Sequence, residues 1–131
     1  MSHHLTLRVY YEDTDLAGIV YYANYLKYIE RGRSEWMRAT GIDQMRMKET
    51  SGHVFAVRHI EADYLRPARF DDTLEVVTTL TSAIGSRIQL DQAVTRDGET
   101  LFRSTVTLVC VDIGVMRAHR MPPALIGALG G

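Results

Sequence analysis

Residues 11–26 combine two closely spaced carboxylates, Asp13 and Asp15, with a glycine, Gly18, just ahead of a segment with helical periodicity. The first amides of a helix have no partners within the helix, and they lie at the positive end of its dipole. They can therefore stabilise a carbonyl oxygen that gains negative charge. A carboxylate held nearby can attack that carbonyl or activate water. The run therefore predicts acyl transfer or hydrolysis.

The residues on either side of this run predict a strand before it and a helix after it. Apolar residues alternate from Leu5 to Tyr11, which is typical of a strand with one buried face. A helix is expected from about Tyr22 to Thr40, with Gly41 as its end. Its expected apolar face consists of Tyr22, Tyr25, Leu26, Ile29, Trp36 and Met37. Gly32 lies on this face, where it costs about 1 kcal/mol relative to alanine, and close packing on a sheet would offset that cost.

The rest of the chain is rich in strands. Residues 42–51 are expected to form a short helical or irregular crossing. The expected strands are His53–Leu65, Thr73–Ser82, Arg87–Thr95 and Leu101–Asp112. Gly85-Ser86 and Asp97-Gly98 are turn signals, so neighbouring strands should be antiparallel. The pattern predicts one α+β domain over residues 1–131, with an antiparallel five-stranded sheet wrapped around one long helix.

Composition narrows the function classes. The 131 residues carry a formal net charge of -1, which gives no reason to expect binding to nucleic acid or to a membrane surface. The start of the chain has no signal-peptide pattern, and no apolar run approaches the ~20 residues of a membrane span. The single cysteine, Cys110, fits a reducing cytoplasm. No metal or other cofactor is expected, since the histidines lack the short spacing of zinc ligands.

Several short motifs together carry a resemblance to a known family. They are Arg8-Val9-Tyr10-Tyr11-Glu12-Asp13-Thr14-Asp15, Gly18-Ile19-Val20-Tyr21-Tyr22, Asn24-Tyr25, Tyr28-Ile29-Glu30-Arg31, Pro67-Ala68-Arg69-Phe70-Asp71-Asp72 and Val109-Cys110-Val111-Asp112. From Leu7 to about Pro122 the chain resembles the hotdog-fold acyl-CoA thioesterases. The resemblance is to the 4-hydroxybenzoyl-CoA thioesterase family and its YbgC branch, which is associated with the Tol-Pal system.

The resemblance implies catalytic roles for three residues. Asp15 takes the place of the catalytic carboxylate, although an aspartate near a helix start can also act as a cap. Gly18 gives the thioester carbonyl access to the main chain, and the backbone N–H of Tyr22 stabilises the oxyanion. The YbgC branch commonly has histidine where this chain has Tyr22, so acyl preference should differ. Asp13 is expected to hold the loop through backbone hydrogen bonds.

Substrate binding is assigned to six further residues. Asn24 either orients the ligand or caps backbone groups. Tyr25 either shapes the acyl pocket or fills the core. The ring of Tyr22 is expected to fill the core as well. Four arginines are candidates for the phosphates of coenzyme A: Arg66, Arg69, Arg117 and Arg120.

The resemblance also implies an oligomer with its active site at the subunit boundary. A homotetramer, built as a dimer of dimers, is expected, with acyl-CoA as substrate and acyl-carrier protein as a possible partner. Two alternatives stay open. One is a hotdog dehydratase or hydratase that uses His53 or His59 with Glu35, and the other is a module that binds acyl thioesters without turnover.

Overall fold

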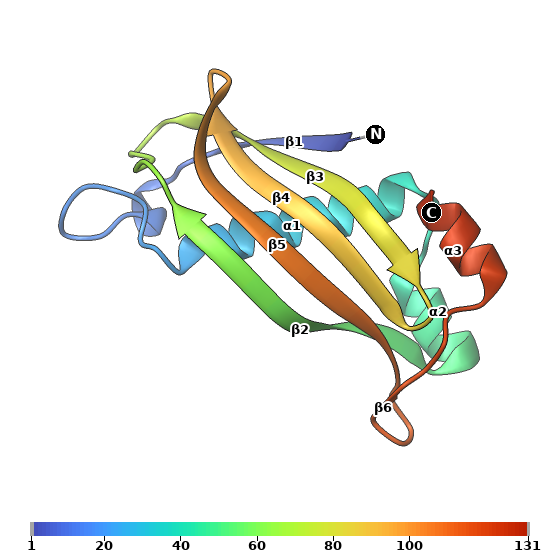
Figure 1. The fold of residues 1–131 in the computed structure, drawn as a ribbon. Coiled ribbons are helices and arrows are strands. Elements are labelled where there is room, and N and C mark those ends of the chain that lie inside the picture. The colour runs from blue at the N-terminus through green and yellow to red at the C-terminus, as the bar shows by residue number, and fades with distance from the viewer. Residues whose placement is uncertain (1, 131) are drawn as a thin grey trace.

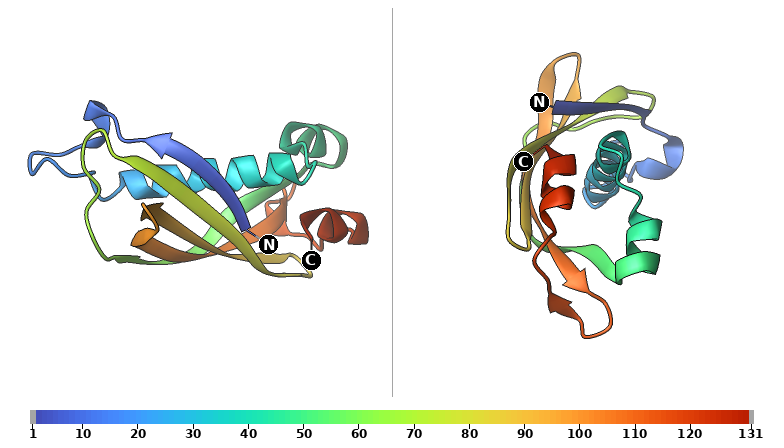
Figure 2. Two further views of the ribbon diagram at one scale, coloured as in Figure 1. Left: turned by 90° about the horizontal axis from the view of Figure 1, so that it is seen from above. Right: turned by 90° about the vertical axis from the view of Figure 1, so that its right-hand side faces the viewer.

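A curled antiparallel sheet wraps around one long helix, α1, as Figures 1 and 2 show. The structure is a computed structural model and describes residues 2–130. Its strands are β1 (Ser2–Arg8), β2 (His53–Tyr64), β3 (Thr73–Ile84), β4 (Arg87–Arg96), β5 (Glu99–Asp112) and the short β6 (Arg117–Ala118). Its helices are α1 (Asn24–Ala39), α2 (Gln44–Ser51) and α3 (Pro123–Leu129), with a 3-10 turn at Tyr11–Asp13. The predicted α+β architecture is confirmed.

The sheet runs in the order β1-β3-β4-β5-β2, with β6 paired to β5, and every pairing is antiparallel. The Asp97-Gly98 hairpin has φ values of 50° and 81°, the left-handed geometry that such two-residue turns require. β2 pairs only with β5 among the described residues, so its other side is a free edge of the sheet.

α1 packs against the sheet through Tyr25, Tyr28, Ile29, Trp36 and Met37, all of which are buried. A Cβ atom on Gly32 would lie 2.5 Å from Val76 Cγ1 of β3. This distance explains the glycine on the apolar face, because any larger residue would push the helix off the sheet. The predicted close approach is confirmed.

Three details of the predicted elements are wrong. The first strand ends at Arg8, and Tyr11 lies exposed in the 3-10 turn because the chain folds back there. The helix begins at Asn24, which leaves Tyr22 outside it and 62% exposed. Leu26 is also exposed, since the helix buries a narrower face than the hydrophobic pattern predicted.

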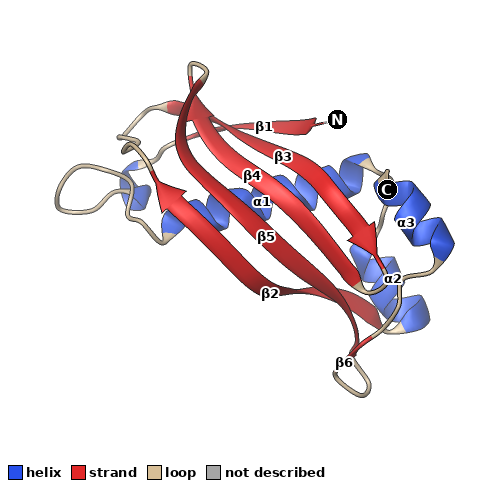
Figure 3. Ribbon diagram, viewed as in Figure 1, coloured by secondary structure: helices blue, strands red, loops and turns tan. Residues whose placement is uncertain are grey.

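The short helices lie on the same side of the sheet as α1, as Figure 3 shows with Figure 2. α2 confirms the predicted crossing: the Asp43 carboxylate accepts a hydrogen bond from Arg46 N, and Gly52 ends the helix with φ +71°. α3 was not predicted, because its seven residues are too few to show a helical period. Within residues 2–130, no helix combines the length and apolar character that a membrane span needs.

Candidate active site

A cleft of about 340 Å³ opens beside the start of α1. The loop 9–23, the end of β2 and the turn that follows β2 enclose it. Its lining residues are Asp15, Ile19, Val20, Tyr21, Tyr22, Tyr25, Tyr64, Leu65, Arg66 and Pro67. The lining is mostly apolar and aromatic, and Asp15 is its one carboxylate. Such a surface suits an acyl group next to a reactive centre.

The Asp15 carboxylate is held by a tight turn of its own loop. Gly18 N donates to Asp15 O over 2.9 Å, and Gly18 adopts φ +80°, which only glycine reaches without strain. Ala17 N donates to Asp15 Oδ1 over 3.0 Å. Among residues 2–130 the structure shows no donor to Asp15 Oδ2. One oxygen therefore fixes the side chain, and the other is free to react.

The start of α1 leaves a backbone amide without a hydrogen-bond acceptor among residues 2–130. Ala23 occupies the N-cap position and makes no side-chain cap. Within the described chain, the N–H of Tyr22 has no hydrogen-bond acceptor. The N–H of Asn24, by contrast, donates to Tyr21 O. An unpaired amide at a helix start is suited to bind a negatively charged oxygen. Asp15 lies nine residues before Asn24, and the helix has no side-chain cap, so the alternative in which Asp15 caps the helix is wrong.

Aromatic rings form the inner wall of the cleft. Tyr25 stacks on Phe102 with ring centroids 5.1 Å apart, and Ala68 N donates to Tyr25 Oη over 3.0 Å. Tyr64 Oη donates to Tyr22 O over 2.9 Å, which ties the end of β2 to the helix start. Burial raises the pKa of Tyr25 and of Tyr64, so both hydroxyls stay protonated at neutral pH.

The predicted loop role of Asp13 is confirmed. Tyr10 N donates to Asp13 Oδ2 over 2.8 Å. Asn24 Nδ2 donates to Asp13 O over 2.9 Å, so the Asn24 side chain holds the loop, and Asn24 is not among the residues that line the cleft. Tyr25 is both core and cleft wall. The predicted core position of the Tyr22 ring is wrong, because that ring lies at the exposed rim.

The four candidate arginines divide into two groups. Arg66 lines the cleft and pairs with Glu99, with Nε and Oε2 3.1 Å apart. Arg69 does not line the cleft, but its backbone forms a bridge with Ile19, which does. Arg117 lies opposite Asp112, ten residues along β5 from the Phe102 that faces Tyr64. At strand spacing this is roughly 33 Å. Arg117 and Arg120 thus lie at the other end of the sheet from the cleft of their own chain (Figure 1).

The sequence reasoning missed Tyr64, Leu65 and Pro67 as cleft residues. The signal was present, since an aromatic residue directly before a proline turn ends the strand that borders the helix start. The residues proposed for a hydratase are not brought together. Glu35 pairs with Arg38 on α1, His59 pairs with Glu61 on β2, and the His53 ring packs on the ring of His119.

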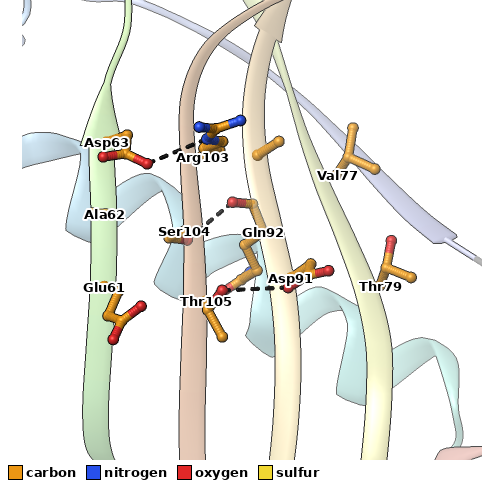
Figure 4. A pocket seen from close by; sticks show the side chains of 11 residues that line it. Glu61, Ala62, Asp63, Val77, Thr79, Asp91, Gln92, Arg103, Ser104 and Thr105 are labelled. Atoms are coloured by element: carbon orange, nitrogen blue, oxygen red, sulfur yellow. Dashed lines mark hydrogen bonds and ion pairs between the residues drawn. The ribbon is translucent and has the colours of Figure 1, made fainter.

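A second hollow, of about 400 Å³, lies across the sheet from β2 to β3 and is drawn in Figure 4. Asp63 pairs with Arg103 over 3.2 Å, and Thr105 Oγ1 donates to Asp91 Oδ1 over 3.5 Å. Ser104 Oγ donates to Gln92 O over 2.9 Å. Its carboxylates Asp63 and Asp91 each lie beside a donor, and α1 passes behind the strands in Figure 4. This hollow is therefore the weaker candidate for chemistry.

Comparison with known proteins identifies the family. Residues 9–129 match the family model of the thioesterase-like superfamily. The chain belongs to this superfamily. The match spans the cleft, the helix and all of the sheet except β1.

Curated members of the superfamily resemble the chain over most of its length. The acyl-CoA thioesterase YbgC of Haemophilus influenzae is 38% identical over 116 residues, which are 88% of this chain and 85% of the relative. The acyl-CoA thioester hydrolase YbgC of Escherichia coli O6:H1 is 36% identical over 121 residues, 92% of this chain and 90% of the relative. The predicted relation to the YbgC branch is confirmed.

Solved structures of the superfamily share the fold. A probable thioesterase from Bartonella henselae has a TM-score of 0.88 at 33% identity, covering 93% of this chain and all of its own. A 4-hydroxybenzoyl-CoA thioesterase mutant complexed with 4-hydroxybenzoyl-CoA has a TM-score of 0.91 at 20% identity, covering 98% of each chain. The predicted hotdog fold is confirmed.

Proposed function

We propose that this protein hydrolyses the thioester of acyl-CoA, with Asp15 as its catalytic carboxylate. The observation that carries the proposal is the pairing of a carboxylate with a free oxygen and an unpaired helix-start amide on one aromatic cleft. The names of the YbgC relatives support the same reaction class. Gly18 does not line the cleft, but its left-handed turn and the hydrogen bond from its amide to Asp15 O hold the backbone of Asp15.

Two courses of the reaction fit this geometry. In one, Asp15 attacks the thioester carbonyl, the C–S bond breaks, coenzyme A leaves as thiolate, and water then opens the acyl-enzyme anhydride. In the other, Asp15 takes a proton from water, which attacks the carbonyl directly. The Tyr22 N–H donates to the oxyanion in both. Thiolate is a good leaving group, so a strong general acid is not required.

Thiol release from a panel of aromatic and aliphatic acyl-CoAs tests the proposal. We expect turnover by the native chain and loss of turnover in Asp15→Asn, with binding retained. Turnover unchanged in Asp15→Asn would exclude the mechanism. Binding of every thioester without turnover would favour a module that only binds acyl thioesters, and hydration of an enoyl-CoA would favour a hydratase.

We infer an aromatic acyl preference from the cleft wall. Tyr22, Tyr25 and Tyr64 make edge-to-face contacts around the space next to Asp15, with Tyr22 and Tyr64 ring centroids 6.2 Å apart. A benzoyl ring can join such a cluster with the same geometry. Benzoyl-CoA should therefore give a higher kcat/KM than an aliphatic thioester of similar size, and the reverse order would contradict the preference.

We also propose that the chain works as a dimer formed through β2. This edge strand is twelve residues long, and it exposes Val57 and Ile60 beside unpaired backbone groups. Such an edge is a template for pairing with a second copy. Sedimentation should show a dimer or a dimer of dimers, and Ile60→Lys should shift it towards monomer. A native chain that sediments as a monomer would contradict this arrangement.

Pairing about a two-fold axis at the centre of β2 would set His53 of the partner subunit opposite Tyr64. Within one subunit, the rings of His53 and His119 have centroids 4.2 Å apart. The partner's segment that carries Arg117 and Arg120 would therefore lie close to this cleft. We propose that Arg117 and Arg120 of the partner subunit bind the coenzyme A phosphates together with Arg66. Arg117→Ala and Arg120→Ala should then raise KM far more than they change kcat.

Three finer parts of the proposal need tests of their own. Asn24 and Arg69 act on the substrate only indirectly, by fixing the loop and the turn that border the cleft. An acyl-carrier protein thioester is a candidate second substrate, checked by comparing its turnover with that of the matching acyl-CoA. A cytoplasmic site of action, which suits a buried single thiol at Cys110, is checked by cell fractionation.

A further inference from the structure

Asp13 joins both ends of the loop 9–23 to the start of α1. Its carboxylate accepts from Tyr10 N, and its backbone oxygen accepts from Tyr21 N and from Asn24 Nδ2, each over 2.8–2.9 Å. Asp15 lies two residues after Asp13, and the Tyr22 amide directly follows Tyr21. The position of Asp13 therefore sets the spacing between the reactive carboxylate and the amide that faces the oxyanion.

Tyr28 lies one helical turn after Asn24, on the same face of α1. Long side chains on a helix lean towards its N-terminus, so the Tyr28 ring points back towards Asn24 and Asp13. Tyr28 is 1% exposed, and its hydroxyl has no hydrogen-bond partner among residues 2–130. A buried hydroxyl without a partner destabilises the fold, and phenylalanine would fill the same space without that cost.

The hydroxyl is kept as a donor by its surroundings. Burial raises the pKa of Tyr28 most, and the neighbouring Asp13 carboxylate raises it further. The hydroxyl therefore stays protonated at neutral pH. It is a buried donor beside the Asp13 carboxylate.

We propose that Tyr28 is a positioning residue that acts through Asp13. In the complex with substrate, the Tyr28 hydroxyl donates to the Asp13 carboxylate and fixes Asp15 relative to the Tyr22 amide. The inference rests on the proposed thioesterase function, but concerns how the site is assembled rather than which reaction it performs.

Tyr28→Phe tests the proposal, with Tyr11→Phe as the matched control in the same region. Tyr11 lies in the loop but is 81% exposed. Tyr28→Phe should lower kcat by about tenfold, the effect of one hydrogen bond to a charged group, with KM nearly unchanged and Tm equal or higher. Tyr11→Phe should change none of the three. A purely structural tyrosine would instead lower Tm and leave kcat unchanged.

A double-mutant cycle with Asp13→Asn separates coupling from independent damage. If Tyr28 acts through Asp13, removing its hydroxyl in the Asp13→Asn background should cost little more kcat. Equal losses in both backgrounds would overturn the proposal, as would an unchanged kcat in Tyr28→Phe. A native chain without thioesterase activity would instead refute the proposed function, so the two failures are distinguishable.

Discussion

The cleft at the start of α1 and the hollow on the sheet are of similar size but differ in how their polar groups are used. In the cleft, Asp15 keeps one oxygen free and Tyr22 keeps its amide free. In the hollow, Asp63 is paired with Arg103 and Asp91 accepts from Thr105. The cleft therefore sets an unpaired carboxylate oxygen and an unpaired amide on one mostly apolar surface, whereas the carboxylates of the hollow lie beside a guanidinium or a hydroxyl donor.

The largest effect should come from removing the amide that we propose as the oxyanion donor. Tyr22→Pro removes the N–H, and we expect kcat to fall by about 10²–10³-fold. Tyr22→Ala keeps the N–H and should lose much less, so the pair separates backbone from ring. Steady-state kinetics measure kcat of both variants, and thermal unfolding checks that their Tm values are equal. Equal losses in the two variants would assign the effect to the side chain.

The fold that supports the cleft should be sensitive to a single methyl group. Gly32→Ala would place its Cβ 2.5 Å from Val76 Cγ1, which forces α1 away from β3. We expect a loss of about 1–3 kcal/mol in the free energy of unfolding, as for an overpacked core. Urea denaturation measures it. Stability equal to that of the native chain would mean that the helix can move without cost.

The ionisation of Asp72, in the turn that borders the cleft, should make the stability of the fold depend on pH. Burial opposes its ionisation, but the Arg69 amide and the Arg96 guanidinium outweigh burial and lower the pKa of Asp72. A carboxyl whose pKa is lower in the folded state stabilises the fold above its ordinary pKa, and this contribution is lost as pH falls through the lowered value.

Asp72→Asn should therefore cost about 1–2 kcal/mol at pH 7. The difference from the native chain should shrink below about pH 4, where the unfolded carboxyl is already protonated. Urea denaturation at several pH values measures this. A difference that is constant from pH 7 to pH 3 would show that ionisation of Asp72 contributes nothing.

The smallest effect should come from the hollow on the sheet. Arg103→Ala breaks an exposed ion pair with Asp63 and should cost less than about 1 kcal/mol, with kcat/KM unchanged. Kinetics and thermal unfolding of this variant check the contrast between the two regions. A large loss of activity would show that this hollow takes part in the reaction.

Much of this architecture could be predicted from local patterns. The ends of elements at Asp97-Gly98, Gly85 and Gly41 could be predicted, because glycine itself favours the backbone geometry of a turn. The sequence motifs around Asp15 likewise predicted the loop, the turn at Gly18 and the loop role of Asp13. The position of Gly32 predicted close packing, which needs no knowledge of the partner strand.

The remaining features depend on contacts between distant segments. Tyr22 follows the helical period, but its backbone is held outside the helix by the loop, and its carbonyl accepts from Tyr64, 42 residues away. Tyr64 also lines the cleft through contacts between distant segments. Strand pairing, rather than a local pattern, decides which residues border α1. Arg117 and Arg120 lie at the far end of β5, a distance that no spacing in the sequence reveals.

The most direct test of the account compares two aspartates, one from each region. Asp15→Asn and Asp91→Asn make the same chemical change, the first in the cleft and the second in the hollow. We expect kcat/KM for a benzoyl thioester of CoA to fall by about 10²–10⁴-fold in Asp15→Asn. It should stay at the native value in Asp91→Asn, with Tm equal in both. Similar activity in the two variants would contradict the assignment of the chemistry to Asp15.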